Sequence, residues 1–91
     1  MSVSVRIPTI LRSYTGGTAV VTGGPGTVRQ LIAGLDADYP GIGGRLLDDS
    51  GQLRRFVNVY VNDDDIRLSE GLDTPVASGG QVSVIPAVAG G

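Results

Sequence analysis

Residues 81–91 read Gln-Val-Ser-Val-Ile-Pro-Ala-Val-Ala-Gly-Gly, and this stretch divides at Pro86. The five residues before the proline form an apolar, strand-like segment, which ends there because proline has no N–H for a sheet ladder. From Pro86 onward no side chain is charged or bulky, and six extended residues reach roughly 20 Å at about 3.3–3.6 Å each. We therefore expect a folded domain at residues 1–85 and a flexible tail at residues 86–91 that carries its terminal carboxylate into another protein's active site.

The two terminal glycines have a second interpretation. Glycine lets a backbone approach a partner closely and adopt angles that other residues disfavour, which suits a tail that enters an active site. Chain ends rich in glycine are also commonly disordered, so the tail alone leaves both interpretations open. The structure expected for the preceding residues decides between them.

The clearest strand lies at residues 56–62, where Val57, Val59 and Val61 point to one side and the residues between them to the other. Three further strands are predicted at 2–7, 18–22 and 66–68. A loop at residues 9–17, with a Gly-Gly turn at its end, joins the first two, which predicts an N-terminal hairpin.

A helix is predicted after the glycine-rich turn at residues 23–26. Thr27 and Gln30 have the spacing of a capping box, which satisfies free N–H groups at a helix start. Apolar residues then recur at helical spacing and form one stripe: Val28, Leu31, Ile32, Leu35 and Tyr39. Pro40-Gly41 ends the helix. Between the helix and the next strand, residues 45–47 form at most one helical turn, and residues 48–51 form a turn by composition. Residues 71–78 are predicted to be a loop, with one helical turn around Leu72.

The predicted order is strand, strand, helix, strand, short strand, strand. One amphipathic helix and one mixed sheet of four or five strands bury their single apolar faces on each other, which is an α+β architecture. If the first and last strands are parallel neighbours, the helix lies in the crossover between them. That arrangement is the β-grasp, or ubiquitin-like, fold.

The composition excludes several kinds of chemistry. The 91 residues include no Cys, His or Lys, which removes thiol nucleophiles, imidazole bases and Schiff-base lysines. The pI near 4.7 and the net charge of −2 argue against nucleic-acid binding. No apolar run approaches the roughly 20 residues of a membrane span, so we expect a cytoplasmic protein that is not an enzyme and binds no metal or cofactor.

Two local motifs resemble ligand sites but do not fit them. The glycines at 23–26 lack the Gly-Lys-Ser/Thr ending of a phosphate-binding loop and are read as a turn. The acidic run Asp63-Asp64-Asp65 has consecutive carboxylates and no closing glutamate, so it does not match a calcium loop. The pair Arg54-Arg55 is either solvated or a small contact for an anion, and surface solvation is the default interpretation.

A β-grasp body that ends in Gly-Gly resembles the MoaD/ThiS/CysO family of ubiquitin-like sulfur carrier proteins. The resemblance covers essentially the whole chain and rests on residues 7–12 (Ile-Pro-Thr-Ile-Leu-Arg), 55–65 and 82–91. The end motif is specific to the superfamily when it is joined to this fold. Residues 7–12 are more similar to the CysO type than to MoaD or ThiS.

The resemblance implies that an ATP-dependent, E1-like enzyme adenylates the carboxylate of Gly91 and that a sulfur donor converts it to a thiocarboxylate. In CysO-like systems the acceptor is a pyridoxal-phosphate (PLP) cysteine synthase, and a metalloprotease releases the cysteine formed. ATP with Mg²⁺, PLP and the metal then belong to the partner enzymes. The residues that present Gly91 are Pro86, Ala87, Val88, Ala89 and Gly90.

Docking must use the folded body, because six small residues offer few contacts. If the strand valines face the helix, the opposite sheet face is open to partners. The residues expected there are Arg6, Asn58, Tyr60, Ser83 and Ile85, and we expect Tyr60 and Ile85 to anchor a partner. Isolated apolar residues on a surface are also normal, so incidental exposure remains the alternative.

Three other functions stay open. A MoaD-like or ThiS-like carrier would deliver sulfur to molybdopterin, a thiazole or a sulfur-containing secondary metabolite. A ubiquitin-like modifier would join Gly91 to lysines of other proteins, because this chain has none of its own. An interaction module with a disordered tail would not need Gly90 and Gly91.

Overall fold

The computed structural model describes residues 2–55 and 57–86, with only the backbone of Pro86. The strands are β1 Val3–Arg6, β2 Val20–Gly23, β3 Gly26–Thr27, β4 Val57–Val61, β5 Asp64–Asp65, β6 Pro75–Val76 and β7 Gln81–Pro86. The α-helices are α1 Val28–Asp38 and α2 Ile42–Leu46. Three 3₁₀ helices complete the elements: η1 Thr9–Thr15, η2 Ile66–Leu68 and η3 Gly71–Asp73.

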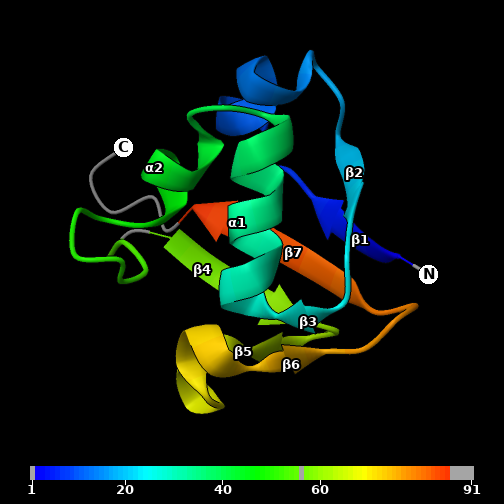
Figure 1. Ribbon diagram of the computed structural model, residues 1–91, viewed down its shortest axis with the longest axis vertical. Coiled ribbons are helices and arrows are strands. Elements are labelled where there is room, and N and C mark those ends of the chain that lie inside the picture. The colour runs from blue at the N-terminus through cyan, green and yellow to red at the C-terminus, as the bar shows by residue number, and fades with distance from the viewer. Residues whose placement is uncertain (1, 56, 87–91) are drawn as a thin grey trace.

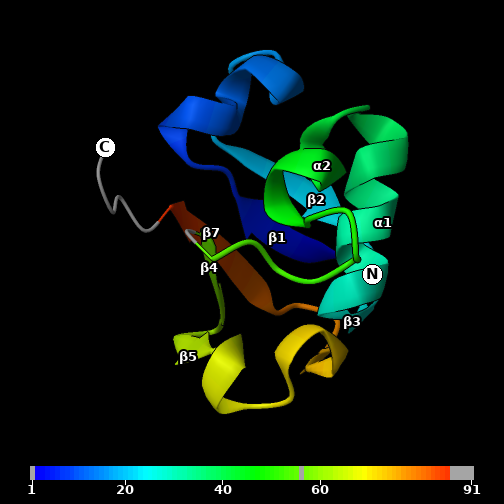
Figure 2. The same ribbon diagram turned by 90° about the vertical axis from the view of Figure 1, so that its left-hand side faces the viewer.

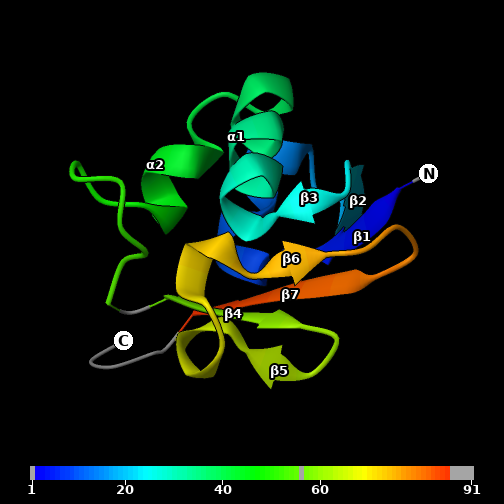
Figure 3. The same cartoon turned by 60° about the horizontal axis from the view of Figure 1, so that its bottom comes forward.

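The main sheet has five strands in the order β2-β1-β7-β4-β5. β1 and β7 are parallel neighbours at its centre, and the remaining pairs are antiparallel. The chain between β1 and β7 includes α1, which lies across one face of the sheet (Figures 1 and 3). This confirms the predicted β-grasp architecture, including the N-terminal hairpin of β1 and β2.

The start of α1 follows from the predicted capping box. The N–H of Gln30 donates to Oγ1 of Thr27 at 3.2 Å, and the N–H of Thr27 donates to Oε1 of Gln30 at 3.0 Å. These two bonds satisfy free donors of the first turn. The helix therefore begins at Val28, and its apolar stripe faces the sheet.

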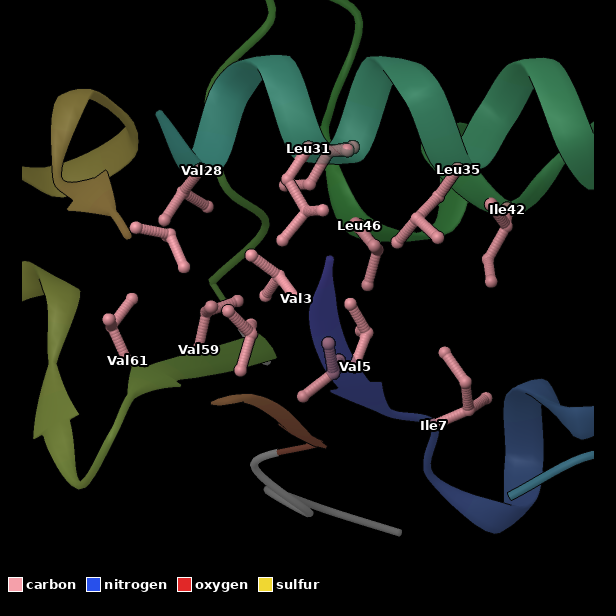
Figure 4. Packing of buried hydrophobic residues seen from close by; sticks show 14 of the residues in the cluster. Val3, Val5, Ile7, Val28, Leu31, Leu35, Ile42, Leu46, Val59 and Val61 are labelled. Atoms are coloured by element: carbon pink, nitrogen blue, oxygen red, sulfur yellow. The ribbon is translucent and has the colours of Figure 1, made fainter. Parts of the chain in front are cut away.

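One hydrophobic cluster fills the space between α1 and the sheet (Figure 4). The predicted stripe residues Val28, Leu31, Ile32 and Leu35 are all buried in it. Tyr39 lies just beyond the helix as its C-cap residue and is half-buried against the cluster. The strand side is made by alternating residues such as Val3, Val5, Val59, Val82 and Val84.

The prediction of a loop at residues 9–17 was wrong, because η1 occupies most of it. Leu11 is buried in the core, and the N–H of Leu11 donates to the carbonyl of Pro8 at 2.9 Å. Oγ1 of Thr15 bonds the carbonyl of Thr18 at 2.8 Å, which closes the segment. Short 3₁₀ helices carry no long periodic signal, so the sequence pattern did not indicate this element.

The prediction of a strand at residues 66–68 was also wrong. The short strand is β5, and η2 follows it. Oδ1 of Asp65 accepts the N–H of Arg67 at 2.9 Å, which caps η2 while Ile66 is fully buried. The helical turn predicted around Leu72 is confirmed as η3.

The turn predicted at residues 45–47 begins earlier and forms α2. Oδ1 of Asp36 accepts the N–H groups of Gly41 at 3.1 Å and of Gly43 at 2.9 Å, which joins α1 to α2. Gly41 has φ 101°, a conformation that favours glycine. A Cβ on Gly43 would lie 2.9 Å from the Asp36 carboxylate, so the approach of the two helices requires a glycine there.

Candidate functional site

The candidate tail begins where β7 ends. In the antiparallel ladder of β7 and β4, Pro86 is opposite Val57, so β7 ends beside the start of β4 (Figure 2). Ala87, Val88, Ala89, Gly90 and Gly91 lie outside the described residues. The candidate site that the structure describes is therefore the root of the tail and the sheet face around it.

On the sheet face opposite α1, here called the open face, one row of side chains crosses all five strands. The strand registers place Val20 opposite Arg6, Arg6 level with Ser83, Ser83 opposite Tyr60, and Tyr60 opposite Asp65. The row thus takes one residue from each strand of the sheet. Residues that neighbour these along the strands, such as Val5, Val59 and Val84, are buried on the α1 side. Alternation along the strands explains this division.

The predicted docking residues lie together on this face. Ile85 is opposite Asn58, one row nearer to the tail than Tyr60. Ile85 is 46% exposed, while Asn58 and Tyr60 are half-buried and Arg6 is exposed. Val20, also 46% exposed, adds an apolar residue on β2 that the sequence reasoning did not include.

Arg67 is a second residue of this site that the sequence reasoning did not include. Nη1 of Arg67 donates to Oδ1 of Asn58 at 2.6 Å, and Nη2 donates to the carbonyl of Arg54 at 2.9 Å. One guanidinium therefore links η2 to β4 and to the segment that precedes β4. The contacts join residues 9 and 13 positions apart, and no local sequence pattern indicates them.

The segment before β4 is held by a turn at Asp48. Oδ1 of Asp48 accepts the N–H of Ser50 at 2.9 Å, the hydroxyl of Ser50 at 2.7 Å and the N–H of Gln52 at 3.0 Å. The hydroxyl bond from Ser50 and the other bonds to the charged form hold the pKa of the Asp48 carboxyl below its usual value. Nε of Arg54 donates to the carbonyl of Gly44 at 2.9 Å, which attaches the segment to α2.

The described residues contain no cluster of three or more potential metal ligands. Asp65 of the acidic run caps η2 through its side chain. Asp63, with φ 133°, lies in the turn between β4 and β5, and Asp64 is the first residue of β5. In the described part of the chain, every helix is too short or too polar to cross a bilayer.

These features define a small ubiquitin-like protein: a β-grasp body, an open sheet face and a terminal segment that continues from the central strand β7. A model of the ThiS family matches residues 5–91. The chain therefore belongs to the ThiS family of ubiquitin-like proteins.

Individual relatives agree with this membership. The chain is 53% identical to the sulfur carrier protein CysO of Mycobacterium tuberculosis, over the full length of both. It is 40% identical over 65 residues to small archaeal modifier protein 3 of Haloferax volcanii, covering 71% of this chain and 70% of the relative. Among solved structures, the Amycolatopsis orientalis BexX/CysO complex contains a chain that matches with a TM-score of 0.91 and 46% identity, covering 98% of this chain and 99% of that one. These relatives are named carriers or modifiers rather than enzymes.

Proposed function

We propose that this chain is a sulfur carrier whose C-terminal Gly91 becomes a thiocarboxylate and donates sulfur for cysteine biosynthesis. The observation that carries the proposal is the 53% identity to CysO over the whole length. Two further features support the proposal. The chain ends in Gly-Gly, and the proposed reaction needs no nucleophilic side chain of the carrier.

In the proposed reaction the Gly91 carboxylate attacks the α-phosphate of ATP on an E1-like enzyme and releases pyrophosphate. A sulfur donor then displaces AMP and leaves the thiocarboxylate. On a PLP-dependent cysteine synthase the thiocarboxylate sulfur becomes the side-chain sulfur of cysteine, which is then still joined to Gly91 as a thioester. An S-to-N acyl shift converts this thioester to an amide bond, and a metalloprotease hydrolyses the amide bond and frees the cysteine. Mg²⁺, PLP and the protease metal belong to these partners. The carrier acts as a cosubstrate, and residues Pro86 to Gly90 extend Gly91 into each active site.

The test is the intact mass of the untagged protein after incubation with its host's E1-like enzyme, ATP and a sulfide donor. We expect a gain that equals replacement of one oxygen by sulfur. A sample without ATP is the control, because adenylation must precede sulfur transfer. An unchanged mass, with an enzyme that is active on another carrier, would contradict the proposal.

The docking part of the proposal concerns the open face. We propose that Ile85 and Tyr60 contact the partner, because they lie one row apart at the root of the tail. The Amycolatopsis CysO forms a complex with BexX, which supports docking of such a body on a protein partner.

The double variant Tyr60→Ala and Ile85→Ala is expected to raise the KM for the carrier about tenfold or more in the thiocarboxylation assay. Truncation of anchoring side chains at an interface commonly costs about 1–2 kcal/mol each. The matched control is Ile10→Ala, which removes an equally apolar side chain that is 69% exposed on η1. Equal KM values for the wild type and the double variant would remove the docking assignment.

A second function is favoured by the relation to a small archaeal modifier protein: attachment of Gly91 to lysine side chains of other proteins. Both functions begin with adenylation, so the intact-mass test does not separate them. Peptides that carry a Gly91 remnant on lysine in digests of host extracts would support the modifier. If such peptides are absent from a sample that contains the thiocarboxylate, the modifier function is contradicted and the carrier function remains.

A further inference from the structure

The arginine side chains of this acidic protein are distributed unevenly. Arg6 is the last residue of β1, and β1 runs parallel to β7. Arg6 therefore lies toward the end of the sheet at which β7 ends. Arg55 comes two residues before Val57, the partner of Pro86. Arg12 and Arg67 lie at the same end of the sheet, because Arg12 bonds Ile7, just after β1, and Arg67 bonds Asn58 and Arg54, at and before the start of β4. We call these four residues, Arg6, Arg12, Arg55 and Arg67, the arginine rim.

Two guanidinium groups of the rim are fixed in place by neutral oxygens. Nε of Arg12 donates to the carbonyl of Ile7, at the end of β1, at 3.1 Å. Arg67 donates to the amide oxygen of Asn58 and to the Arg54 carbonyl. These bonds hold the side chains without cancelling their charge. In the part of the chain that the structure describes, the one salt bridge is Arg29–Asp73, at 3.5 Å, and it involves none of the four rim arginines.

Two acidic residues lie at the opposite end of the sheet. Asp63 lies in the turn that connects β4 to β5, and Asp64 is the first residue of β5; this turn is at the end of the sheet opposite to the end of β7 (Figure 3). In the row across the open face the acidic member is Asp65, on the edge strand farthest from Arg6. Arg54 is not included in the rim, because its charge acts on Asp48 and contributes to the lowered pKa of that carboxyl.

We propose that the arginine rim docks on an acidic protein surface that surrounds the slot receiving the tail. The proposal rests on the proposed function, since it concerns the partner that modifies Gly91. A local cluster of like charge at the root of the tail orients the protein during encounter, even though the whole chain is negative. Arginines that are already held by hydrogen bonds lose less freedom on binding than free ones. The acidic turn between β4 and β5 would point away from such a partner, which favours one orientation.

The experiment measures steady-state thiocarboxylation by the host's E1-like enzyme at increasing carrier concentration, in buffers of low and high ionic strength. The test variant is Arg6→Gln with Arg55→Gln, because neither side chain makes a hydrogen bond to the described residues. The control is Arg29→Gln with Arg45→Gln, two arginines of α1 and α2. Both double variants change the formal net charge equally, from −2 to −4. Thermal melting confirms that all proteins are folded.

We expect the test variant to raise the KM about tenfold at low salt, with kcat changed less than about twofold, because exposed rim charges act mainly on association. The control should stay within about twofold of the wild type. The difference should shrink toward 1 M salt, where the Debye length falls to about 3 Å.

Each outcome has a separate meaning. Equal KM values for the test variant and the control would contradict docking through the arginine rim. The carrier function would stand, since both proteins would still gain sulfur. A loss that does not respond to salt would also contradict such docking, because the effect would then not be electrostatic. If the wild type gains no sulfur at all, both the proposed function and docking through the arginine rim are contradicted.

Discussion

Deletion of Gly91 is expected to reduce thiocarboxylate formation at least about a hundredfold. Removing one residue withdraws the carboxylate by about 3.3–3.6 Å along an extended chain. A displacement of about 1 Å from the reactive geometry can already cost a factor of about a hundred. The measurement is the rate of the mass gain with the E1-like enzyme, ATP and sulfide.

The control for this deletion is the stability of the same protein. Gly91 lies beyond β7, the last strand of the sheet, so the melting temperature should remain that of the wild type. Gly91→Val is a second control, because it keeps the length and the carboxylate but crowds the reacting carbon. We expect it to react much more slowly than the wild type. Undiminished sulfur transfer by the deletion variant would contradict the role of Gly91.

Leu35→Ala is expected to destabilise the fold by about 2–5 kcal/mol. Leu35 is 2% exposed and lies on α1 against the hydrophobic cluster (Figure 4). Truncation of a buried leucine removes its transfer free energy and leaves a cavity that the surroundings fill only partly. In a domain of this size each kcal/mol lowers the melting temperature by about 4–8 °C. Thermal melting followed by circular dichroism measures the change.

Leu68→Ala provides the matched control for that prediction. Leu68 is 89% exposed on η2, so the same chemical change should alter the free energy of unfolding by less than about 0.5 kcal/mol. If Leu35→Ala were as mild as Leu68→Ala, the packing of α1 on the sheet described here would be wrong. The comparison of the two leucines thus separates the effect of burial on the free energy of unfolding from the effect of truncating any leucine side chain.

The regular elements could be predicted from local patterns. The alternating valines of β4 and the capping box at Thr27 specify a strand and a helix through short-range physics. The parallel pairing of β1 and β7 could only be assumed in order to derive the β-grasp fold, because it joins residues about 80 positions apart. A single helix and a single sheet must bury their apolar faces on each other, which left few other arrangements.

Other elements form because of contacts with distant parts of the chain. The short pairing of β3 with β6 involves two residues on each strand, too few to give a periodic signal. In η1 and η2 the core positions of Leu11 and Ile66 impose 3₁₀ turns where composition indicated a loop and a strand. Propensity is a weak guide wherever burial of one side chain outweighs it.

For the candidate site, the sequence by itself determined the uncharged tail with its terminal glycines, the absence of Cys, His and Lys, and the alternation that places Tyr60 and Ile85 on the open face. The row across the sheet, the bridge from Arg67 to Asn58 and the gathering of arginines at one end were decided only by the tertiary structure. Alternation and capping act between residues a few positions apart, so they are visible in the sequence. Strand register and long-range hydrogen bonds exist only once the chain has folded, because they depend on which distant segments become neighbours.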